Sequence, residues 1–573
     1  MNRREFLQLL AAGAACGMSI DSPRVLAGNA NAFDDRRLYD IAPFGNVSLL
    51  HFTDCHAQLL PLHYREPAVN IGVGAAHGKP PHLVGDALLK HFGIPAGSAV
   101  AHAFTCLDFS AAAQTYGKVG GFAHLASLVK QLRGTRPGAL LLDGGDTWQG
   151  SATALWTQGQ DMVDVCLALG VDVMTGHWEF TYGAQRVNEL LERNLRGHID
   201  FVAQNIRTTD FEDPVFPGYV MREVNGVPVA IIGQAYPYTK IANPAYFVPD
   251  WSFGIREREL QNTVDEVNSQ GAQLVILLSH NGMDIDLKLA SRVSGIDAIL
   301  GGHTHDAVPA PIFVDNPGGR TLVTNAGSNG KFLGVLDFDV RRGRVFDVRY
   351  RLLPVFSNLL PADPEMSQLI AEKRRPYTGE LGETLALTDG LLYRRGNFNG
   401  SFDDLILQAL MDVNDAPIAF SPGFRWGPSI LPGQTLTRED VMNQTAITYP
   451  SVTVNEISGE QIKAILEDVC DNLFNPDPYY QQGGDMVRVG GMTYACAPHE
   501  AIGSRISDMR LNGDPISAQR KYRVAGWASI SPDVQGTPVW NVVESWLRAR
   551  RHLAPIRASK PRLIGVANDP GIV

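Results

Sequence analysis

Residues 47–56 read VSLLHFTDCH, an apolar run that leads directly into a polar Asp-x-His motif. A short apolar run of this kind predicts a buried strand, and α/β sheets present their ligands just beyond the carboxyl ends of such strands. Asp54 and His56 are therefore candidate ligands. Cys55 lies between them, so its side chain should point to the opposite side of an extended backbone, and we interpret it as a packing residue.

The same pattern is repeated from about residue 46 to about residue 350. Further apolar runs cover residues 139–143, 171–174, 227–233, 274–278 and 298–300, and segments with helical periodicity cover 123–133, 184–194 and 256–270. Strands that alternate with helices in this way predict an α/β domain around a buried sheet. Residues 61–116 fit neither pattern and are rich in Gly, Pro and His, so we expect an irregular excursion that serves as a lid or as a docking surface.

Polar residues follow five of these apolar runs at the point where each run ends. Together they supply seven candidate ligands: Asp54, His56, Asp146, His177, His280, His303 and His305. Each one alone is more often an ordinary polar residue, but a whole set at successive strand ends is hard to explain in that way. One ion would not use them all, whereas a carboxylate such as Asp146 can bridge two cations about 3.5–4 Å apart. A His-rich set that includes Asp and lacks a thiolate favours manganese, zinc or iron over copper(I) or calcium.

The composition describes a globular protein with large cores. Of 573 residues 45% are apolar, and 49 Lys and Arg stand against 60 Asp and Glu, for a formal net charge of −11. There is no basic excess that could neutralise a phosphate backbone, so we expect no nucleic-acid partner. The cysteines beyond residue 32 form no CxxC pair, and their spacing leaves open which of them would form disulfides.

The first 32 residues are typical of a twin-arginine export signal. Arg3 and Arg4 precede an apolar run at residues 9–18, and the small residues Ala30 and Ala32 suit a cleavage site. The run is too short to span a hydrocarbon core of ~30 Å. We therefore expect a periplasmic protein without a membrane anchor. Removing the three Arg and two acidic residues of this segment leaves 46 basic and 58 acidic residues, a net charge of −12.

The sequence pattern changes after residue 362, and we place a domain boundary there. The first domain would cover residues 33–362, a linker helix residues 363–380, and a second, α+β unit residues 381–557. Residues 558–573 contain Pro and Gly without apolar periodicity, which predicts a loose tail.

The order of the motifs resembles that of the calcineurin-like metallophosphoesterases. D-x-H, G-G-D, G-x-x-E-F, S-H-x-G and G-H-x-H follow one another at residues 54–56, 144–146, 176–180, 279–282 and 302–305. The stretch SPGFRWG at 421–427 and the segments 452–463 and 489–494 are similar to parts of the second domain of the 5′-nucleotidase family. The resemblance implies a four-layer αββα metallophosphoesterase domain followed by an α+β 5′-nucleotidase-type C-terminal domain.

The family pattern, carried over onto matching positions, implies two metal sites that share one carboxylate. The first site would use Asp54, His56, Asp146 and His305, and the second would use Asp146, His177, His280 and His303. Arg425 stands where the family has a substrate-contacting Arg.

Two departures separate this chain from the nucleotidases. The usual G-N-H-E motif reads Gly176-His177-Trp178-Glu179, so His177 replaces a metal-binding Asn and Trp178 replaces the catalytic His. The G-G-D-G-[FY] turn that supplies a base-stacking aromatic residue is absent, and residues 525–531 read AGWASIS. Together with the export signal and the string GHWEFTYG at 176–183, these departures resemble the thiosulfohydrolases of periplasmic sulfur-oxidation systems.

That resemblance implies an enzyme with two Mn²⁺ ions that releases sulfate from a cysteine S-thiosulfonate on a SoxYZ-type sulfur carrier protein, through attack by a metal hydroxide. A persulfide-type sulfur leaves more readily than an alkoxide, so the loss of a proton-donating His is tolerable. The resemblance gives catalytic roles to Trp178, as an apolar wall with an indole N–H, and to Arg425, which could pair with the sulfonate oxygens. Plain packing of Trp178 and an ordinary ion pair of Arg425 remain alternatives. A periplasmic 5′-nucleotidase or other phosphoesterase is the competing function, and a metal-loaded binding module is a third.

Overall fold

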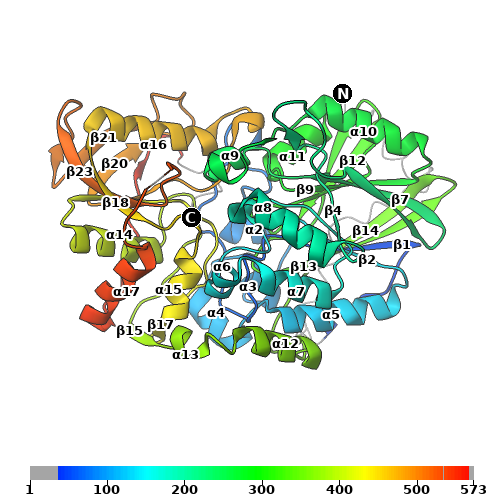
Figure 1. Ribbon diagram of the computed structural model, residues 1–573, viewed down its shortest axis with the longest axis horizontal. Coiled ribbons are helices and arrows are strands. Elements are labelled where there is room, and N and C mark those ends of the chain that lie inside the picture. The colour runs from blue at the N-terminus through cyan, green and yellow to red at the C-terminus, as the bar shows by residue number, and fades with distance from the viewer. Residues whose placement is uncertain (1–36, 533, 567–573) are drawn as a thin grey trace.

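The computed structural model describes residues 37–532 and 534–566, and the export signal predicted for residues 1–32 lies outside this range. Figure 1 shows two lobes, with the N-terminal part of the chain on the right and the C-terminal part on the left. Among the described residues, no helix is both long enough and apolar enough to cross a membrane.

Two six-stranded sheets form the centre of the N-terminal domain. The first has the order β14 (Arg344–Pro354), β13 (Phe332–Arg341), β1 (Val47–Phe52), β2 (Leu140–Asp143), β3 (Val173–Met174), β4 (Asp200–Phe201). The second has the order β11 (Ile312–Asn316), β12 (Gly319–Asn325), β10 (Ala298–Gly301), β9 (Leu274–Ser279), β7 (Val227–Gln234), β6 (Tyr219–Val224). The strands predicted from the apolar runs are therefore present in both sheets.

The two sheets pack face to face with helices on both outer sides. Leu49 of β1 and Ile276 of β9 lie in the core between the sheets, whereas the alternate residue Leu50 faces outward. Helices α5 (Phe122–Thr135) and α7 (Gln160–Leu169) cover the outer face of the first sheet, and α10 (Glu257–Ser269) and α11 (Met283–Ala290) cover that of the second. Burial on both faces explains why these strands are continuous apolar runs. The four-layer αββα arrangement is confirmed.

The strand directions bring the predicted ligands to one edge. In the first sheet β1 is parallel to β2, with Phe52 opposite Asp143, and β2 is parallel to β3. In the second sheet β7, β9 and β10 are parallel. The carboxyl ends of parallel strands meet at the same side of a sheet, so the polar motifs that follow them converge.

The excursion at residues 61–116 contains three α-helices, which corrects the expectation of an irregular segment. It contains α2 (Gly85–Phe92), α3 (Ala99–Phe104) and α4 (Phe109–Tyr116). Phe104 packs against Phe332 of β13 with ring centroids 4.8 Å apart. Helix α3 of the excursion therefore packs into the same core that lies between the two sheets. The three helices are too short for their apolar periodicity to stand out among Gly, Pro and His.

The C-terminal domain has the α+β composition that the sequence predicted. Helix α12 (Pro364–Arg374) begins in the expected linker, where the Asp363 side chain accepts a hydrogen bond from the backbone N–H of Met366. Beyond it, helices α14 (Ser401–Asn414), α16 (Gly459–Phe474) and α17 (Val539–Arg550) pack around the sheet β18 (Val452–Ser458), β23 (Lys521–Trp527), β16 (Ile418–Ser421), β19 (Arg488–Gly490).

One part of the predicted loose tail is ordered. Strand β25 (Arg562–Leu563) pairs in parallel with β20 (Met492–Cys496), and the backbone N–H of Ile564 donates to the carbonyl of Cys496 at 2.8 Å. Backbone hydrogen bonds of this kind need no apolar periodicity, which explains why the sequence did not predict the strand.

Candidate metal centre

All seven predicted ligands meet where the carboxyl ends of the two sheets face each other. Segments that follow β1, β2 and β3 supply Asp54, His56, Asp146 and His177, and segments that follow β9 and β10 supply His280, His303 and His305. Every one of these side chains is buried, the most exposed being His303 at 9%. Residues up to 251 positions apart in the chain therefore form one polar cluster, from Asp54 to His305.

The cluster divides into two groups of four whose ligand atoms lie within 4.8 Å of one another. One group is Asp54, His56, Asp146 and His305, and the other is Asp146, His177, His280 and His303. Asp146 belongs to both, with one carboxylate oxygen 3.1 Å from His280 Nε2 and the other 3.2 Å from His177 Nδ1. The grouping is the one that the family pattern implied, whereas metal ligation itself stays a prediction.

The donor atoms of the cluster fit two cations. Among the described residues, His177 Nε2 and both ring nitrogens of His303 are buried without a hydrogen-bond partner. His280 Nδ1 bonds the carbonyl oxygen of Gly144 at 2.6 Å, which orients Nε2 toward the Asp146 carboxylate. Unpartnered imidazole nitrogens beside a shared carboxylate are costly in a protein interior unless they coordinate an ion, and nitrogen and oxygen donors without sulfur suit manganese, zinc or iron.

The electrostatics of the cluster are dominated by burial and by the shared carboxylate. Burial opposes charge on His280, but Asp146 and Asp54 outweigh it and raise the pKa of His280 to about 10. Burial raises the pKa of Asp54 to about 6. Asp146 is also buried, yet His177 and His280 hold its pKa well below the usual range. Without a cation the cluster therefore holds protons that a metal would displace.

The backbone of the centre is held in an unusual conformation. Five of the seven predicted ligands have positive φ: Asp54 (53°), His56 (45°), Asp146 (58°), His303 (71°) and His305 (58°). Such left-handed conformations are uncommon outside glycine and persist where the surrounding structure enforces them. Here the N–H of Asp54 donates to the carbonyl of Gly145, and the N–H of His56 to that of Asp146, each at 2.8 Å. The loops after β1 and β2 thus hold each other in place.

Glu179 ties two ligand-bearing loops together. Its carboxylate accepts backbone N–H bonds from His177 at 2.8 Å, Thr147 at 2.7 Å, and Asp146 and Trp148 at 3.2 Å. The backbones that carry Asp146 and His177 are therefore fixed relative to each other. The sequence placed Glu179 in the G-x-x-E-F and G-H-W-E motifs without predicting a role for it, although its position two residues after His177 was a signal.

The C-terminal domain supplies one wall of the centre. Trp426 stacks on the His56 ring with centroids 4.9 Å apart, and Trp178 meets Trp426 edge-on at 5.1 Å. A cavity of about 200 Å³ adjoins the centre and is lined by Trp178, Tyr236, Phe424, Arg425 and Trp426. Tyr236 was missed by sequence reasoning although it follows β7 by two residues; its ring lies 4.1 Å from that of His303.

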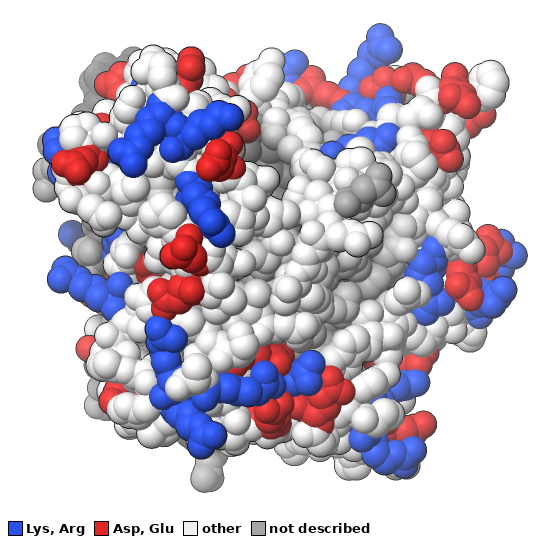
Figure 2. All heavy atoms as spheres, turned by 60° about the vertical axis from the view of Figure 1, so that its left-hand side comes forward, with Lys and Arg blue, Asp and Glu red and all other residues white. Residues whose placement is uncertain are grey.

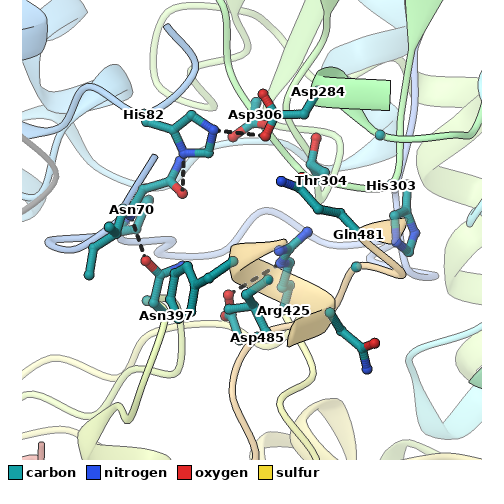
Figure 3. A pocket seen from close by; sticks show the side chains of 18 of the residues that line it. Asn70, His82, Asp284, His303, Thr304, Asp306, Asn397, Arg425, Gln481 and Asp485 are labelled. Carbon is teal, nitrogen blue, oxygen red and sulfur yellow. Dashed lines mark hydrogen bonds and ion pairs between the residues drawn. The ribbon is translucent and has the colours of Figure 1, made fainter. Parts of the chain in front are cut away.

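Arg425 makes the ion pair that the sequence left open as one alternative, while its contact with substrate stays a prediction. Its Nη2 donates to the carbonyl of Gly484 at 2.7 Å, and its Nε lies 3.3 Å from an Asp485 carboxylate oxygen. Its Nη1 is buried without a partner in the described structure. Figure 3 shows a second pocket, which Arg425, Asp485 and His303 line together with Asn70 and His82 of the excursion.

Comparisons with known proteins agree with this architecture. A family model for the 5′-nucleotidase C-terminal domain matches residues 387–541. Human 5′-nucleotidase is 28% identical over 454 residues, which is 71% of this chain and 76% of the human protein. Bovine 5′-nucleotidase is 29% identical over 324 residues, and the match spans 52% of this chain but only 55% of the bovine protein. The chain thus spans about half the length of some curated relatives.

Two solved structures extend the likeness to almost the whole chain. A 5′-nucleotidase precursor from Thermus thermophilus has a TM-score of 0.71 at 21% identity, covering 91% of this chain and 99% of that one, which shows a common fold. The sulfate thiohydrolase SoxB from the same species, solved in complex with glycerol, has a TM-score of 0.86 at 35% identity, covering 92% of this chain and 98% of that one. Fold and site together define a two-domain hydrolase of the metallophosphoesterase type. Within that class, the chain belongs to the SoxB family.

Proposed function

We propose that the protein is a thiosulfohydrolase that releases sulfate from a cysteine S-thiosulfonate on a SoxYZ-type carrier protein. The observation that carries the proposal is Trp178, which occupies the position of the phosphatases' catalytic His. An indole cannot transfer a proton to an alkoxide leaving group, whereas a persulfide sulfur leaves without one. The 35% identity to a sulfate thiohydrolase over nearly the whole chain supports the same interpretation.

The two groups of ligands would hold two Mn²⁺ ions, with zinc or iron as alternatives. Bound there, the cations would supply a Lewis-acid centre that activates water and neutralises charge on a tetrahedral oxyanion. The protein's own part is to keep that centre rigid. Glu179 fixes the backbones of Asp146 and His177, and the Gly144 carbonyl orients His280.

Arg425 would position the sulfonate. Its guanidinium is fixed on one side by Gly484 and Asp485, which leaves the unpartnered Nη1 as a donor for a substrate oxygen. Trp178, Phe424 and Trp426 would form an aromatic wall against which a polarisable sulfur packs favourably. None of these four side chains needs to transfer a proton in this scheme.

The carrier would present its modified cysteine on an extended arm, because the predicted ligands are buried between two domains and a globular surface could not reach them. On the face shown in Figure 2, Lys and Arg alternate with Asp and Glu around a broad area with few charges. With a mature net charge of −12 and no strong patch of one sign on that face, the enzyme would gain little from long-range attraction if the carrier is acidic, and docking would then be weak and transient. Export by the twin-arginine route to the periplasm is part of this proposal.

A periplasmic 5′-nucleotidase or other phosphoesterase is the second candidate, and the match of residues 387–541 to the nucleotidase C-terminal domain favours it. One metal-analysed preparation should be assayed for sulfate release from sulfonated carrier and for phosphate release from AMP. We expect sulfate release with little phosphate release. Phosphate release from AMP without turnover of carrier would replace the proposed function by the alternative.

A further inference from the structure

Trp178 belongs to the N-terminal domain, but its side chain packs in the hydrophobic core of the C-terminal domain. Among the described residues it is the one buried member of the large C-terminal core that comes from before residue 385. Its ring meets Phe424 and Trp426 edge-on, with centroids 5.5 and 5.1 Å apart, and lies parallel to Tyr449 at 6.4 Å. Separating the domains would therefore expose this aromatic side chain and break its ring contacts.

Hydrogen bonds between the domains surround this contact. The Thr181 and Thr448 hydroxyls lie 2.7 Å apart, and the Tyr449 hydroxyl donates to the carbonyl of Ala242 at 2.9 Å. Gln149 Nε2 donates to the carbonyl of Ala446 at 2.7 Å. The C-terminal loop 445–449 is therefore tied to three separate segments of the N-terminal domain.

The domains also touch through a second segment of the C-terminal domain. The segment 481–485 lies over the metal centre, where a Cβ added to Gly483 would be 2.0 Å from His303 Nε2. The Tyr236 hydroxyl donates to the carbonyl of Gln482. On the rim, Lys288 and Asp477 form an ion pair at 2.6 Å. Rotating one domain away from the other would break both sets of contacts at once.

We propose that Trp178 is a positioning residue that holds the two domains in one fixed arrangement, so that the centre accepts the end group of an extended chain and turns over without domain opening. The choice of substrate rests on the proposed function, whereas the fixed arrangement of the two domains is independent of that function. A bulky substrate would need the domains to separate, whereas the end of an arm can enter the cavity beside Trp178 and Phe424 as it stands.

A cross-link tests whether turnover needs domain opening. The double variant Thr181→Cys/Thr448→Cys places two thiols where the hydroxyls are 2.7 Å apart, close enough for a disulfide. Oxidised and reduced forms should release sulfate from sulfonated carrier at rates within about twofold of each other. A loss of about tenfold or more on oxidation, recovered by reductant, would overturn the proposal. Wild type and the single variant Thr181→Cys, treated with the same oxidant, control for the native cysteines.

A second measurement needs no substrate. Small-angle scattering should give the same radius of gyration for wild type and for the cross-linked variant, and a larger one for Trp178→Ala. Phe180→Ala is the matched control, because Phe180 is buried among rings of its own domain, Phe201, Phe216 and Trp251. It should destabilise the fold without separating the domains. A radius for Trp178→Ala equal to that of wild type would refute the fixed arrangement, whereas wild type that fails to turn over carrier would refute only the proposed function.

Discussion

The Nε2 atoms of His56 and His305 lie 3.0 Å apart, although the two residues are separated by 249 positions in the chain. Burial lowers the pKa of His56, and it lowers that of His305 well below the usual range, so both rings are neutral. Two neutral imidazoles can share one hydrogen bond, but two lone pairs aimed at the same point are stabilised far better by a cation. Asp54 Oδ1 lies 3.3 Å from His305 Nε2 and completes this side of the centre.

The assignment of His177 to the second site predicts a change in metal stoichiometry. His177→Ala should lower the metal content toward one ion per chain and abolish turnover, because one of the four donors of that site is lost. Elemental analysis of purified protein measures the content, and His552→Ala, at an exposed histidine of the C-terminal domain, is the control. Two ions per chain with a normal rate would contradict the assignment.

We expect substitution of Arg425 to weaken the processing of substrate without changing the metal content. Arg425→Ala should lower kcat/KM for sulfonated carrier about 10- to 100-fold, the range expected for losing hydrogen bonds to a charged group. Arg425→Lys should recover little, because an ammonium lacks the planar paired geometry. Metal content should stay at the wild-type value in both variants, since Arg425 is not among the candidate ligands. Normal processing of carrier by Arg425→Ala would remove this residue from the substrate site.

Gly483 and Gly484 provide a matched pair for the close approach over His303. Both have left-handed backbone, with φ of +73° and +76°, so an added Cβ strains both by a similar amount. Only at Gly483 would it also collide with the His303 ring, at 2.0 Å, whereas at Gly484 the nearest atom is 3.9 Å away. Gly483→Ala should therefore lose metal and activity much more than Gly484→Ala. Equal losses of metal and activity in the two variants would mean that the segment 481–485 can move away from His303 at little cost.

Glu179→Gln tests the bond network that joins the two ligand loops. The amide keeps the volume but replaces one accepting oxygen by a donor that faces backbone N–H groups. The free energy of unfolding should fall by about 1–3 kcal/mol, and metal should dissociate faster. Glu189→Gln, on the partly exposed helix α8 (Gly183–Leu190), should change neither quantity. Unchanged metal dissociation in Glu179→Gln would leave Glu179 with no part in holding the centre.

Metal affinity should increase with pH. The metal-free protein has the pKa of Asp54 raised to about 6 and that of His280 raised to about 10. Both groups must lose a proton to ligate, so protons compete with metal below these values, and the competition from Asp54 disappears above about pH 6. Mn²⁺ affinity should rise from about pH 5 to about pH 8, with protons released on binding in weak buffer. Affinity that is independent of pH over this range would contradict the prediction.

Much of the fold and the whole candidate ligand set could be predicted from the sequence, because both depend on local patterns. A buried strand is an apolar run whatever its neighbours are, and a polar motif at its end stays at the edge of the sheet. Val47 to Phe52 and the Asp54–His56 motif illustrate this, as strand β1 has the predicted bounds. Short helices in a segment rich in Gly and Pro, such as α3, and the pairing of β25 carry no comparable local signal.

The surroundings of each ligand depend on contacts between distant segments, and no local pattern encodes them. The identity of Trp178 was visible in the sequence, but its burial in the core of the other domain follows from domain packing. The contact of Tyr236 with the His303 ring and the close approach of Gly483 to that ring also follow from the packing of distant segments. Periodicity reports which side of an element is buried, whereas the partner on that side is selected by the shape and energy of the whole packed structure.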